Sequence, residues 1–305
     1  MRYLTNLNSS HNKASVITIG NFDGLHLGHR KLIYTVKKLA IENAYESIVF
    51  SFHPHPHKLL NKKDFPGMIF SREEKRKRLE EIGIDTYIEY PFTKEFANYS
   101  AKEFVENILL KQLNAKIIVL GSNNKFGKNQ EGNVNFLKER TSLWGLSVIE
   151  IPPVLHNDLV VSSSRVREEL IKGNIEIVNE LLSLPYIVKG TIVEGRKIGR
   201  QIGYPTANIL PEKDRLYPPN GVYLTKTKYK NKTYNSITNI GCNPTVRGKN
   251  RIIETYIDDF CQMVYGESIC IKFYKWLREE RKFSNLDELV EQLNSDAKIC
   301  REYFK

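Results

Sequence analysis

The sequence has few cysteines and no long hydrophobic run, and each absence excludes a class of protein. The four cysteines, Cys242, Cys261, Cys270 and Cys300, include no C-x-x-C pair, which excludes a zinc ribbon and a disulfide-stapled scaffold. No segment reaches the ~20 apolar residues of a membrane span, and the N-terminus lacks the apolar core of a signal peptide. We therefore expect a soluble, unprocessed protein in a reducing cytoplasm.

Internal repeats, low-complexity tracts and a disorder-type composition are also missing. The 305 residues are 41% hydrophobic and 27% charged, which is typical of a globular protein. A domain usually has roughly 100–200 residues, so this length predicts two domains. Lys and Arg number 46 against 35 Asp and Glu, a net charge of +11, but the two signs are mixed. We interpret the excess, such as the basic run 75–78, as solvated surface and not as a nucleic-acid footprint.

Short apolar segments alternate with amphipathic ones in the first part of the chain. Two of the helical patterns open with the spacing of a capping box, Ser71 with Glu74 and Ser100 with Glu103. Alternating strands and helices predict a doubly wound α/β domain whose ligands lie beyond the carboxyl ends of the strands. The expected strands are 16–19, 47–52, 87–90, 116–120 and 147–151.

From about Pro185 the pattern changes to β-rich segments separated by Gly, Pro and Asn turns. This pattern predicts an antiparallel barrel or sandwich, followed by a helix at 286–303. The domain boundary is placed after two short helices, at 165–172 and 175–182, which gives domains 1–184 and 185–305. The expected strands of the second domain are 187–193, 221–229, 232–240, 252–260 and 268–277.

A strand, a glycine-containing turn and a helix start follow one another in the segment VITIGNFDGLHLGHRKLI. His26 and His29 are three residues apart and share a face of the helix start, whose free N–H groups suit an anion. Gly28 lets a phosphate or an adenine approach the backbone closely. Imidazole N–H groups there would stabilise the charge that builds up as pyrophosphate leaves. The alternatives are histidines that only cap the turn, and a zinc site that includes His53, His55 and His57.

A second candidate site combines a glycine-rich loop with a possible metal-binding pair. Glycines recur at Gly195, Gly199 and Gly203, between two strand patterns, and can fold over a triphosphate or simply form a turn. The Thr206 hydroxyl and the Asn208 carbonyl that follow are hard oxygen ligands, which suit Mg²⁺.

The segment RIIETYIDDF alternates apolar and polar residues as a strand does. Glu254 and Tyr256 therefore share one face. Glu254 is a candidate functional carboxylate on this face, although an exposed strand glutamate is the alternative.

These motifs resemble those of the bacterial bifunctional riboflavin kinase/FMN adenylyltransferase (FAD synthetase) family. The resemblance covers nearly the whole chain, and the occurrence of HxGH followed by PTAN is highly specific. It implies an N-terminal Rossmann-like nucleotidyltransferase domain and a C-terminal riboflavin kinase barrel with a final helix. Further stretches that resemble family motifs are FHPHP at 52–56, SSSRVR at 162–167, NIGCNPT at 239–245, YG at 265–266 and LREERKF at 277–283.

The resemblance implies two reactions, phosphorylation of riboflavin by ATP and transfer of AMP from a second ATP to FMN. It makes Glu254 the general base of the first, and His26 and His29 electrostatic stabilisers of the second. ATP, riboflavin and FMN are then the substrates and Mg²⁺ is the cofactor, on Thr206 and Asn208. No nucleic acid or membrane partner is expected, and the oligomeric state is left open.

The resemblance also implies the binding residues of each site. For adenylyl transfer, ATP is expected on Gly20, Phe22, Asp23, Gly24, His26, Gly28, His29, Ser163, Ser164 and Arg165. For phosphorylation, ATP is expected on Gly195, Gly199, Gly203, Thr206 and Asn208. The flavin of the adenylyl transfer site is expected on Phe52, Pro54, His55, Pro56, Asn123 and Phe126.

The chain departs from the family pattern at two positions. The family pattern G-x-[D/N]-F-x-F-G has an aromatic residue where Asn124 stands, so one stacking surface for the flavin is missing. Asn243 stands where an arginine is expected. One alternative is therefore a flavin-binding or regulatory protein that retains one of the two activities. A tRNA-linked nucleotidyltransferase also fits HxGH and the positive charge, but no KMSKS-like lysine loop is present.

Overall fold

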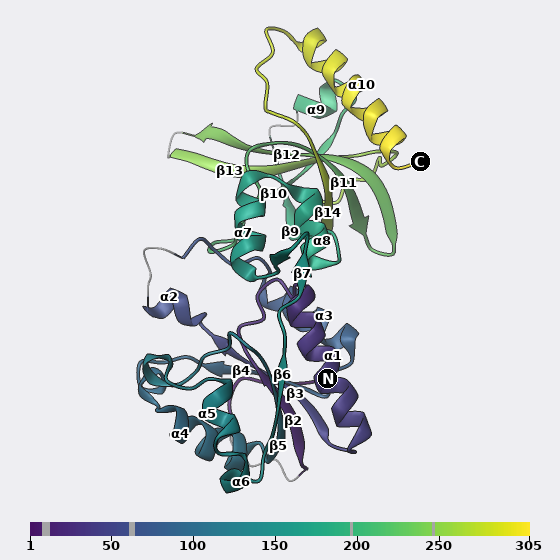
Figure 1. The fold of residues 1–305 in the computed structure, drawn as a ribbon. Helices are drawn as coiled ribbons and strands as arrows, with labels where there is room; N and C mark the ends of the chain where they lie inside the picture. The colour runs from purple at the N-terminus through teal and green to yellow at the C-terminus, as the bar shows by residue number, and fades with distance from the viewer. Residues whose placement is uncertain (8–12, 61–64, 196–197, 246–247) are drawn as a thin grey trace. The chain divides into compact units, whose positions relative to one another are not determined.

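A parallel sheet and a closed barrel make up the chain in this computed structural model (Figure 1). The structure describes residues 1–305 except 8–12, 61–64, 196–197 and 246–247. By its contacts the chain divides into two compact units, Met1–Ser163 and Ser164–Lys305, and the expected boundary at 184/185 stays a prediction. The two fold types confirm the expected α/β domain followed by a β domain.

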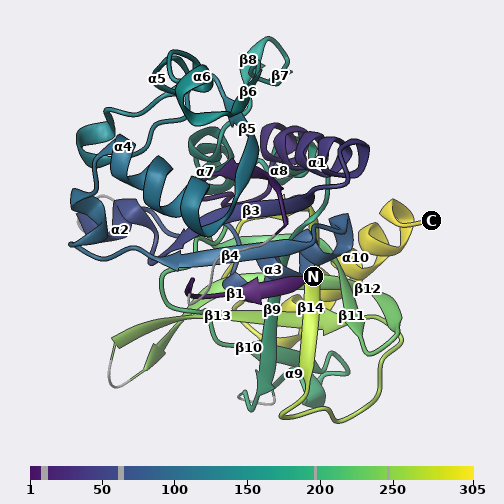
Figure 2. The ribbon, with the colours of Figure 1, turned by 90° about the horizontal axis from the view of Figure 1, so that it is seen from below.

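The first unit contains a six-stranded sheet in the order β1-β4-β3-β2-β5-β6, in which every pair is parallel. The five expected strands are present, and the sequence reasoning missed β1, a three-residue segment that pairs with β4 at the sheet edge (Figure 2). The strands are β1 (Arg2–Leu4), β2 (Ser15–Ile19), β3 (Glu46–His53), β4 (Thr86–Pro91), β5 (Ala115–Gly121) and β6 (Ser147–Ile151), with the hairpin β7 (Leu155–His156) and β8 (Leu159–Val160) after them.

Helices cover both faces of this sheet. Ile17 and Ile19 of β2 belong to a core with the helix around Phe104, whereas Val16 packs in a core with α1. Both predicted capping boxes are confirmed, at the starts of α3 and α4. The helices are α1 (Leu27–Glu42), α2 (Pro56–Leu60), α3 (Arg72–Ile82), η1 (Phe96–Asn98), α4 (Ala101–Glu103), the π-helical η2 (Phe104–Gln112), η3 (Lys128–Gln130), α5 (Val134–Lys138) and α6 (Thr141–Trp144).

The strand order creates a topological switch point in the sheet. The chain leaves β2 through α1 and returns in β3 on one side, whereas β5 pairs with the other side of β2. The connections therefore diverge beyond the carboxyl ends of β2 and β5, which is where open α/β sheets bind ligands.

The barrel of the second unit closes in the order β10-β13-β12-β11-β14-β9, and each neighbouring pair is antiparallel. Of the two expected architectures, the barrel is therefore the correct one. The sequence pattern did not predict β10, whose four residues directly follow Pro205. The strands are β9 (Tyr186–Val193), β10 (Thr206–Ile209), β11 (Gly221–Tyr229), β12 (Lys232–Thr245), β13 (Gly248–Ile257) and β14 (Ser268–Arg278).

Two short helices precede the barrel strands, one lies between them and one follows. The Asn179 side chain of α8 donates to the Phe273 carbonyl at 2.9 Å and accepts from the Tyr186 N–H at 2.7 Å, which ties α8 to the barrel. These helices are α7 (Ser163–Lys172), α8 (Ile175–Leu182), α9 (Ile198–Gln201) and α10 (Leu286–Tyr303). Among the described residues, none of the helices has both the length and the apolar character that crossing a membrane requires.

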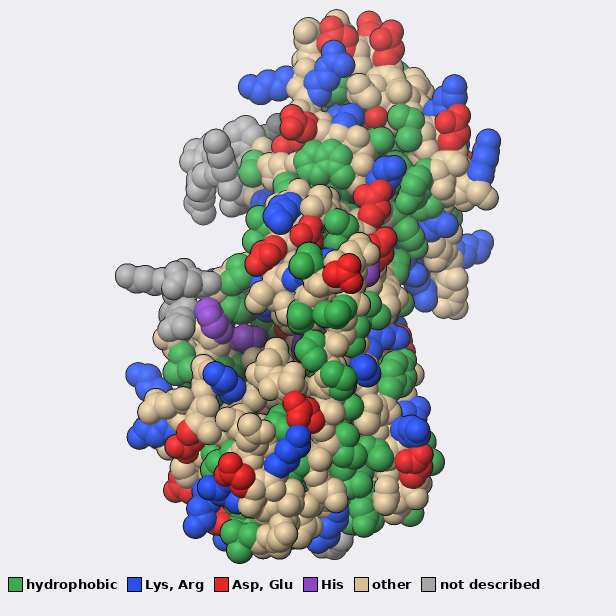
Figure 3. Space-filling view, in the orientation of Figure 1, with side chains coloured by type: hydrophobic (Ala, Val, Ile, Leu, Met, Phe, Trp, Pro, Cys, Tyr) green, Lys and Arg blue, Asp and Glu red, His purple; other side chains and the backbone are tan. Residues whose placement is uncertain are grey.

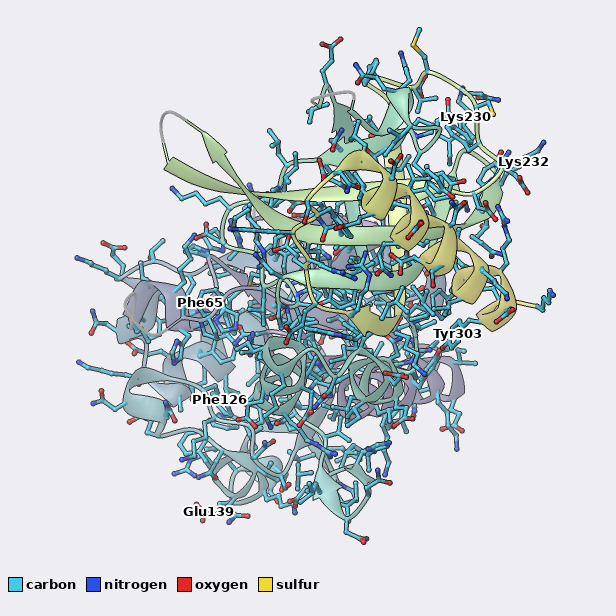
Figure 4. The ribbon with its side chains drawn as sticks, turned by 90° about the horizontal axis from the view of Figure 1, so that it is seen from above. Phe65, Phe126, Glu139, Lys230, Lys232 and Tyr303 are labelled. Atoms are coloured by element: carbon cyan, nitrogen blue, oxygen red, sulfur yellow. The ribbon has the colours of Figure 1, made fainter. Side chains whose placement is uncertain are left out.

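Two ion pairs fasten α10 to the barrel. Arg278, the last residue of β14, donates to the buried Asp296 carboxylate at 3.1 and 2.7 Å. Arg301 binds Asp258 at 2.7 and 2.8 Å, and its hydrogen bonds hold the pKa of the Asp258 carboxyl below the ordinary value. Tyr303, at the end of α10, is labelled in Figure 4.

The Asp296→Ala substitution is expected to lower the free energy of unfolding of the second unit by about 3 kcal/mol, because it leaves Arg278 without its carboxylate. The chain has two tryptophans, so a Trp144→Phe background leaves Trp276 as the fluorescent reporter of this unit in urea unfolding. Glu302→Ala, at an exposed position of the same helix, is the control and should change stability by less than about 0.5 kcal/mol. Equal effects of the two substitutions would contradict the anchoring role.

Candidate active sites

The first site begins with a tightly wound loop after β2. Phe22 and Leu25 have φ values of 50° and 45°, a region that side-chain-bearing residues rarely adopt, and Gly24 has a φ of 81°. A Cβ added to Gly24 would lie 3.0 Å from Ile69, so the loop packs closely against the chain below it. The loop therefore adopts a conformation that its surroundings must maintain.

The loop delivers two stacked histidines to the start of α1. His26 is the N-cap, and its Nδ1 accepts the N–H of His29 at 3.4 Å. The two rings stack with centroids 3.6 Å apart, and His29 also lies edge-on to Phe22. A Cβ at Gly28 would lie 3.2 Å from the His26 ring, so a side chain at this position would crowd that ring. The structure thus brings together the predicted residues of this motif at a helix N-terminus, where N–H groups favour an anion.

Two predicted ATP-binding residues stabilise the loop itself. The buried Asp23 carboxylate accepts the N–H groups of Ile69 at 3.0 Å and Phe70 at 3.2 Å. The Ser163 hydroxyl donates to the Asp23 carbonyl at 3.0 Å. Ser164 is exposed and Arg165 half-buried in the first turn of α7.

Aromatic rings lie beneath the carboxyl edge of the sheet. Phe52 packs against Phe92 and Phe104, and Phe126, which is 6% exposed, packs against Phe104. Phe126 is therefore part of the core and presents little ring surface, while Phe52 is half-buried.

The FHPHP stretch continues from β3 into α2. The His53–Pro54 peptide bond is cis, and Pro56 begins α2. The His55 ring lies 5.1 Å from Phe65, which Figure 4 labels together with Phe126.

Within the described residues, no group of three His, Cys, Asp or Glu side chains is arranged to hold a metal ion, so the zinc alternative has no ligand cluster there.

Asn123 and Asn124 form the turn after β5. Asn123 is exposed, whereas the Asn124 side chain donates to the Ile19 carbonyl at 2.8 Å. This hydrogen bond joins the carboxyl ends of β5 and β2 at the switch point. Asn124 therefore has a structural role at the position where the family pattern has an aromatic ring.

A buried charged cluster lies under the first site, and sequence reasoning missed it. The interpretation of the run 75–78 as solvated surface is wrong for Lys75, which is 3% exposed. The buried Glu89 carboxylate accepts from Tyr3 at 2.7 Å and from Arg72 at 2.8 Å. Burial alone would raise the pKa of Glu89, but Lys75, Tyr3 and Arg72 together hold it below the ordinary value.

The second site lies across three neighbouring barrel strands. Glu254 of β13 stands directly opposite Asn208 of β10 on one side and Asn239 of β12 on the other. Directly opposite residues share a face of the sheet, so the three side chains are neighbours. Asn208 is 4% exposed, and its Oδ1 atom has no hydrogen-bond partner among the described residues. An oxygen buried in this way is suited to accept a ligand.

Two of the three predicted loop glycines stand where a side chain would not fit. A Cβ at Gly195 would overlap the Asn208 amide, and one at Gly199 would overlap the Tyr204 carbonyl. Gly203 has a φ of 82°. A small pocket here is lined by Gly195, Gly199, Arg200, Pro205, Thr206, Asn208 and Tyr265. The structure thus brings the predicted residues Gly195, Gly199, Thr206 and Asn208 together in one pocket, which Gly203 does not line. It adds Arg200, which directly follows Gly199, and the distant Tyr265, which belongs to the YG stretch.

Glu280 approaches the same strands from the stretch after β14. Its carboxylate accepts from the Asn220 amide at 3.2 Å and from the Asn239 amide at 3.5 Å. A Cβ at Gly241 would overlap this carboxylate, so the glycine of NIG permits the approach. Asn239 and Glu280 were not among the predicted site residues, although both lie in motifs that the resemblance covers.

Comparison with known proteins matches both units. A family model described as FAD synthetase matches residues 8–165, and one described as riboflavin kinase matches residues 182–304. A solved structure titled "Crystal Structure of Macrolide-efflux Protein from Streptococcus pneumoniae" superposes with a TM-score of 0.91 and 29% identity, over 99% of each chain.

Three curated relatives carry the name bifunctional riboflavin kinase/FMN adenylyltransferase. The relative from Buchnera aphidicola subsp. Acyrthosiphon pisum is 38% identical and covers 96% of this chain and 94% of its own. The relative from Bacillus subtilis is 36% identical, and the match covers 95% of this chain and 92% of the relative. The relative from Escherichia coli K12 is 31% identical, and the match covers 100% of this chain and 97% of the relative.

The charged cluster predicts an acid-dependent loss of stability in the first unit. The stabilisation from Glu89 is fully present above its unfolded pKa, near 4.5, and is lost as the pH falls through its lower folded pKa. Glu89→Gln should therefore cost about 2 kcal/mol at pH 7, a difference from wild type that shrinks below pH ~4.5. Urea unfolding in a Trp276→Phe background, with Trp144 as reporter, measures it. A difference that stays constant down to pH 3 would contradict this account.

Proposed function

The chain belongs to the bifunctional riboflavin kinase/FMN adenylyltransferase family and makes FMN from riboflavin and FAD from FMN, and we propose that each site described above performs one of these reactions. Phosphorylation is placed at the barrel strands and adenylyl transfer at the carboxyl edge of the sheet. The observation that carries this proposal is the row Asn208, Glu254 and Asn239, in which a carboxylate stands beside a buried amide oxygen that has no hydrogen-bond partner in the described part of the chain. Matches to both family models leave the single-activity alternative without support.

In the phosphorylation reaction, Glu254 is proposed to accept the proton of the riboflavin 5′-hydroxyl. The hydroxyl oxygen then attacks the γ-phosphorus of ATP, and ADP leaves as the bond to the β–γ bridging oxygen breaks. Phosphoryl transfer needs mainly alignment and charge neutralisation, so one base and a phosphate loop are sufficient. The glycines Gly195, Gly199 and Gly203 are proposed to let the backbone of this loop approach the phosphates. A Cβ at Gly195 or Gly199 would overlap neighbouring atoms of the site.

Mg²⁺ is the metal that fits the residues present at this site. Asn208 offers a buried carbonyl oxygen that none of the described residues hydrogen-bonds, and Thr206 offers a hydroxyl in the same pocket. Both are hard oxygen ligands. When bound, Mg²⁺ neutralises charge on the phosphate oxygens. The chain's own residues orient the nucleotide and move the proton.

In the adenylyl transfer reaction, a phosphate oxygen of FMN attacks the α-phosphorus of ATP and pyrophosphate leaves. His26 and His29 are proposed to donate hydrogen bonds to phosphate oxygens as charge develops, and the N-terminus of α1 adds its N–H groups. Asp23 and Ser163 contribute by maintaining the loop, while Ser164 and Arg165 are proposed to contact ATP directly.

The flavin of this site is proposed to lie on the sheet edge near the FHPHP stretch. Phe52 and His55 are half-buried and offer ring surface, and Pro54 and Pro56 shape the turn between them. Asn123 supplies an exposed polar group, whereas the buried ring of Phe126 supports the layer from below.

We also retain the functional boundary at 184/185 as a proposal, because the second family model begins at residue 182. A cytoplasmic location suits the four free cysteines. Lys and Arg are interspersed with Asp and Glu on the face in Figure 3, which favours small anionic substrates over a nucleic-acid partner.

Two single substitutions are expected to separate the half-reactions. Glu254→Gln should lower kcat for riboflavin phosphorylation by roughly 10²-fold or more and leave adenylylation of supplied FMN within about twofold, because it removes the general base alone. His29→Ala should lower adenylyl transfer by roughly 10²-fold and leave phosphorylation unchanged. Separate assays of the two steps, with each variant checked for folding, measure this. Loss of both activities in one folded variant would contradict the assignment of two sites.

The metal proposal predicts a change in Mg²⁺ requirement at one step only. Asn208→Leu removes a proposed oxygen ligand, so the Mg²⁺ concentration for half-maximal phosphorylation should rise about tenfold or more. Asn208→Asp keeps an oxygen ligand and is the matched control, with a smaller rise expected. Titration of both activities with Mg²⁺ at constant ATP measures the effect. An equal rise in the adenylyl transfer step would contradict a site-specific role.

A further inference from the structure

A lysine buried beneath the first site makes contacts that the proposed mechanism does not use. Lys75 is 3% exposed, and its Nζ donates to the Asn21 carbonyl at 3.2 Å and to the Ser51 hydroxyl oxygen at 3.2 Å. The Ser51 hydroxyl donates to the same carbonyl at 3.2 Å. The Asn21 carbonyl therefore accepts two hydrogen bonds from buried side chains of α3 and β3.

Glu89 accounts for only part of the burial of this lysine. The Lys75 ammonium lies 3.6 Å from the Glu89 carboxylate, which is bound more closely by Tyr3 and Arg72. Tyr87 also donates to that carboxylate, at 3.1 Å. A buried ammonium group is strongly unfavourable unless it is compensated, and burial lowers the pKa of Lys75 despite the nearby carboxylates of Glu89 and Asp23. A methionine would occupy the same space without that penalty, so the charge itself has a role.

The contacted carbonyl lies at the start of the wound part of the loop. Asn21 directly precedes Phe22, the first residue with positive φ, and the loop ends in His26, the N-cap of α1. Rotation of the Asn21–Phe22 peptide would change the φ of Phe22 and move everything that follows. Fixing this carbonyl therefore fixes the direction in which the loop carries the two histidines.

We propose that Lys75, supported by Ser51, is a positioning residue for adenylyl transfer that acts through the Asn21 carbonyl. It sets the conformation of the loop 20–26 and hence the placement of His26 and His29 on the phosphates. The inference rests on the proposed function of the first site.

The test is a comparison of steady-state constants for both reactions in Lys75→Met. The kcat of adenylyl transfer should fall roughly 10- to 100-fold, because small displacements of positioned groups cost rates of this size. The KM values for ATP and FMN should change less than about threefold, since the residue does not touch substrate. Riboflavin phosphorylation in the same molecules should stay unchanged. Lys77→Met, exposed on the same helix, is the matched control and should leave both reactions unchanged.

A second variant separates positioning from folding. In Lys75→Met with Glu89→Gln, one positive and one negative charge are removed together, so the net charge of the cluster is that of the wild type, and kcat should still stay low because the hydrogen bond to the Asn21 carbonyl is missing. Lys75→Arg restores a cation and should recover part of kcat. If the double variant has wild-type kcat, the positioning role is wrong and Lys75 only balances Glu89.

The His29→Ala variant, measured in parallel, shows whether an unexpected result means that Lys75 has no positioning role or that the site itself is wrongly assigned. If His29→Ala leaves adenylyl transfer intact, the assignment of the site is wrong. If His29→Ala abolishes it and the double variant does not lower it, only the inference about Lys75 is wrong. Should neither lysine variant fold, Ser51→Ala removes a neutral donor to the same carbonyl and should lower kcat several-fold, and an unchanged kcat there would overturn the proposal.

Discussion

The hydrogen-bonded register of the barrel strands places Glu254 between Asn208 and Asn239. Along β13 the neighbouring Thr255 points the other way and is fully buried, where its hydroxyl bonds Thr238 at 3.0 Å. A slip of one residue would exchange these two faces, burying the carboxylate and exposing the threonine. The proposed site of phosphorylation thus depends on strand pairing more than on any contact between its own side chains.

The proposed adenylyl transfer site depends on a different constraint. Its histidines stand on a loop with positive φ values, and the loop is maintained by groups beneath it and not by strand pairing. Asp23 accepts two backbone N–H groups, and the Asn21 carbonyl accepts from Lys75 and Ser51. Asn124 joins the ends of β5 and β2 beside it. The two proposed sites are therefore held in place in different ways. One is a row of residues on paired strands, and the other is a loop held by hydrogen bonds from buried groups.

Features encoded within a few residues were predictable from the sequence. The capping boxes at Ser71 and Ser100, the span of α10 and the strand alternation around Glu254 all follow from local pattern, and the structure agrees. Features that depend on residues far apart in the sequence could not be predicted. Closure of the barrel needs the pairing of β10 with β13, the burial of Lys75 needs Ser51 and Glu89, and the approach of Glu280 needs Gly241. The run of basic residues at 75–78 gives no local sign that Lys75 is buried, because its partners come from distant parts of the chain.

If each of the two proposed sites works without the other, FMN made in one molecule can be used by another. The most direct measurement mixes equal amounts of the Glu254→Gln and His29→Ala proteins with riboflavin, ATP and Mg²⁺ and follows FAD by chromatography. The account predicts FAD from the mixture and essentially none from either protein alone, because FMN made by the intact kinase site of one molecule reaches the intact adenylyl transfer site of the other. No FAD from the mixture, while each protein retains its remaining half-reaction, would contradict it.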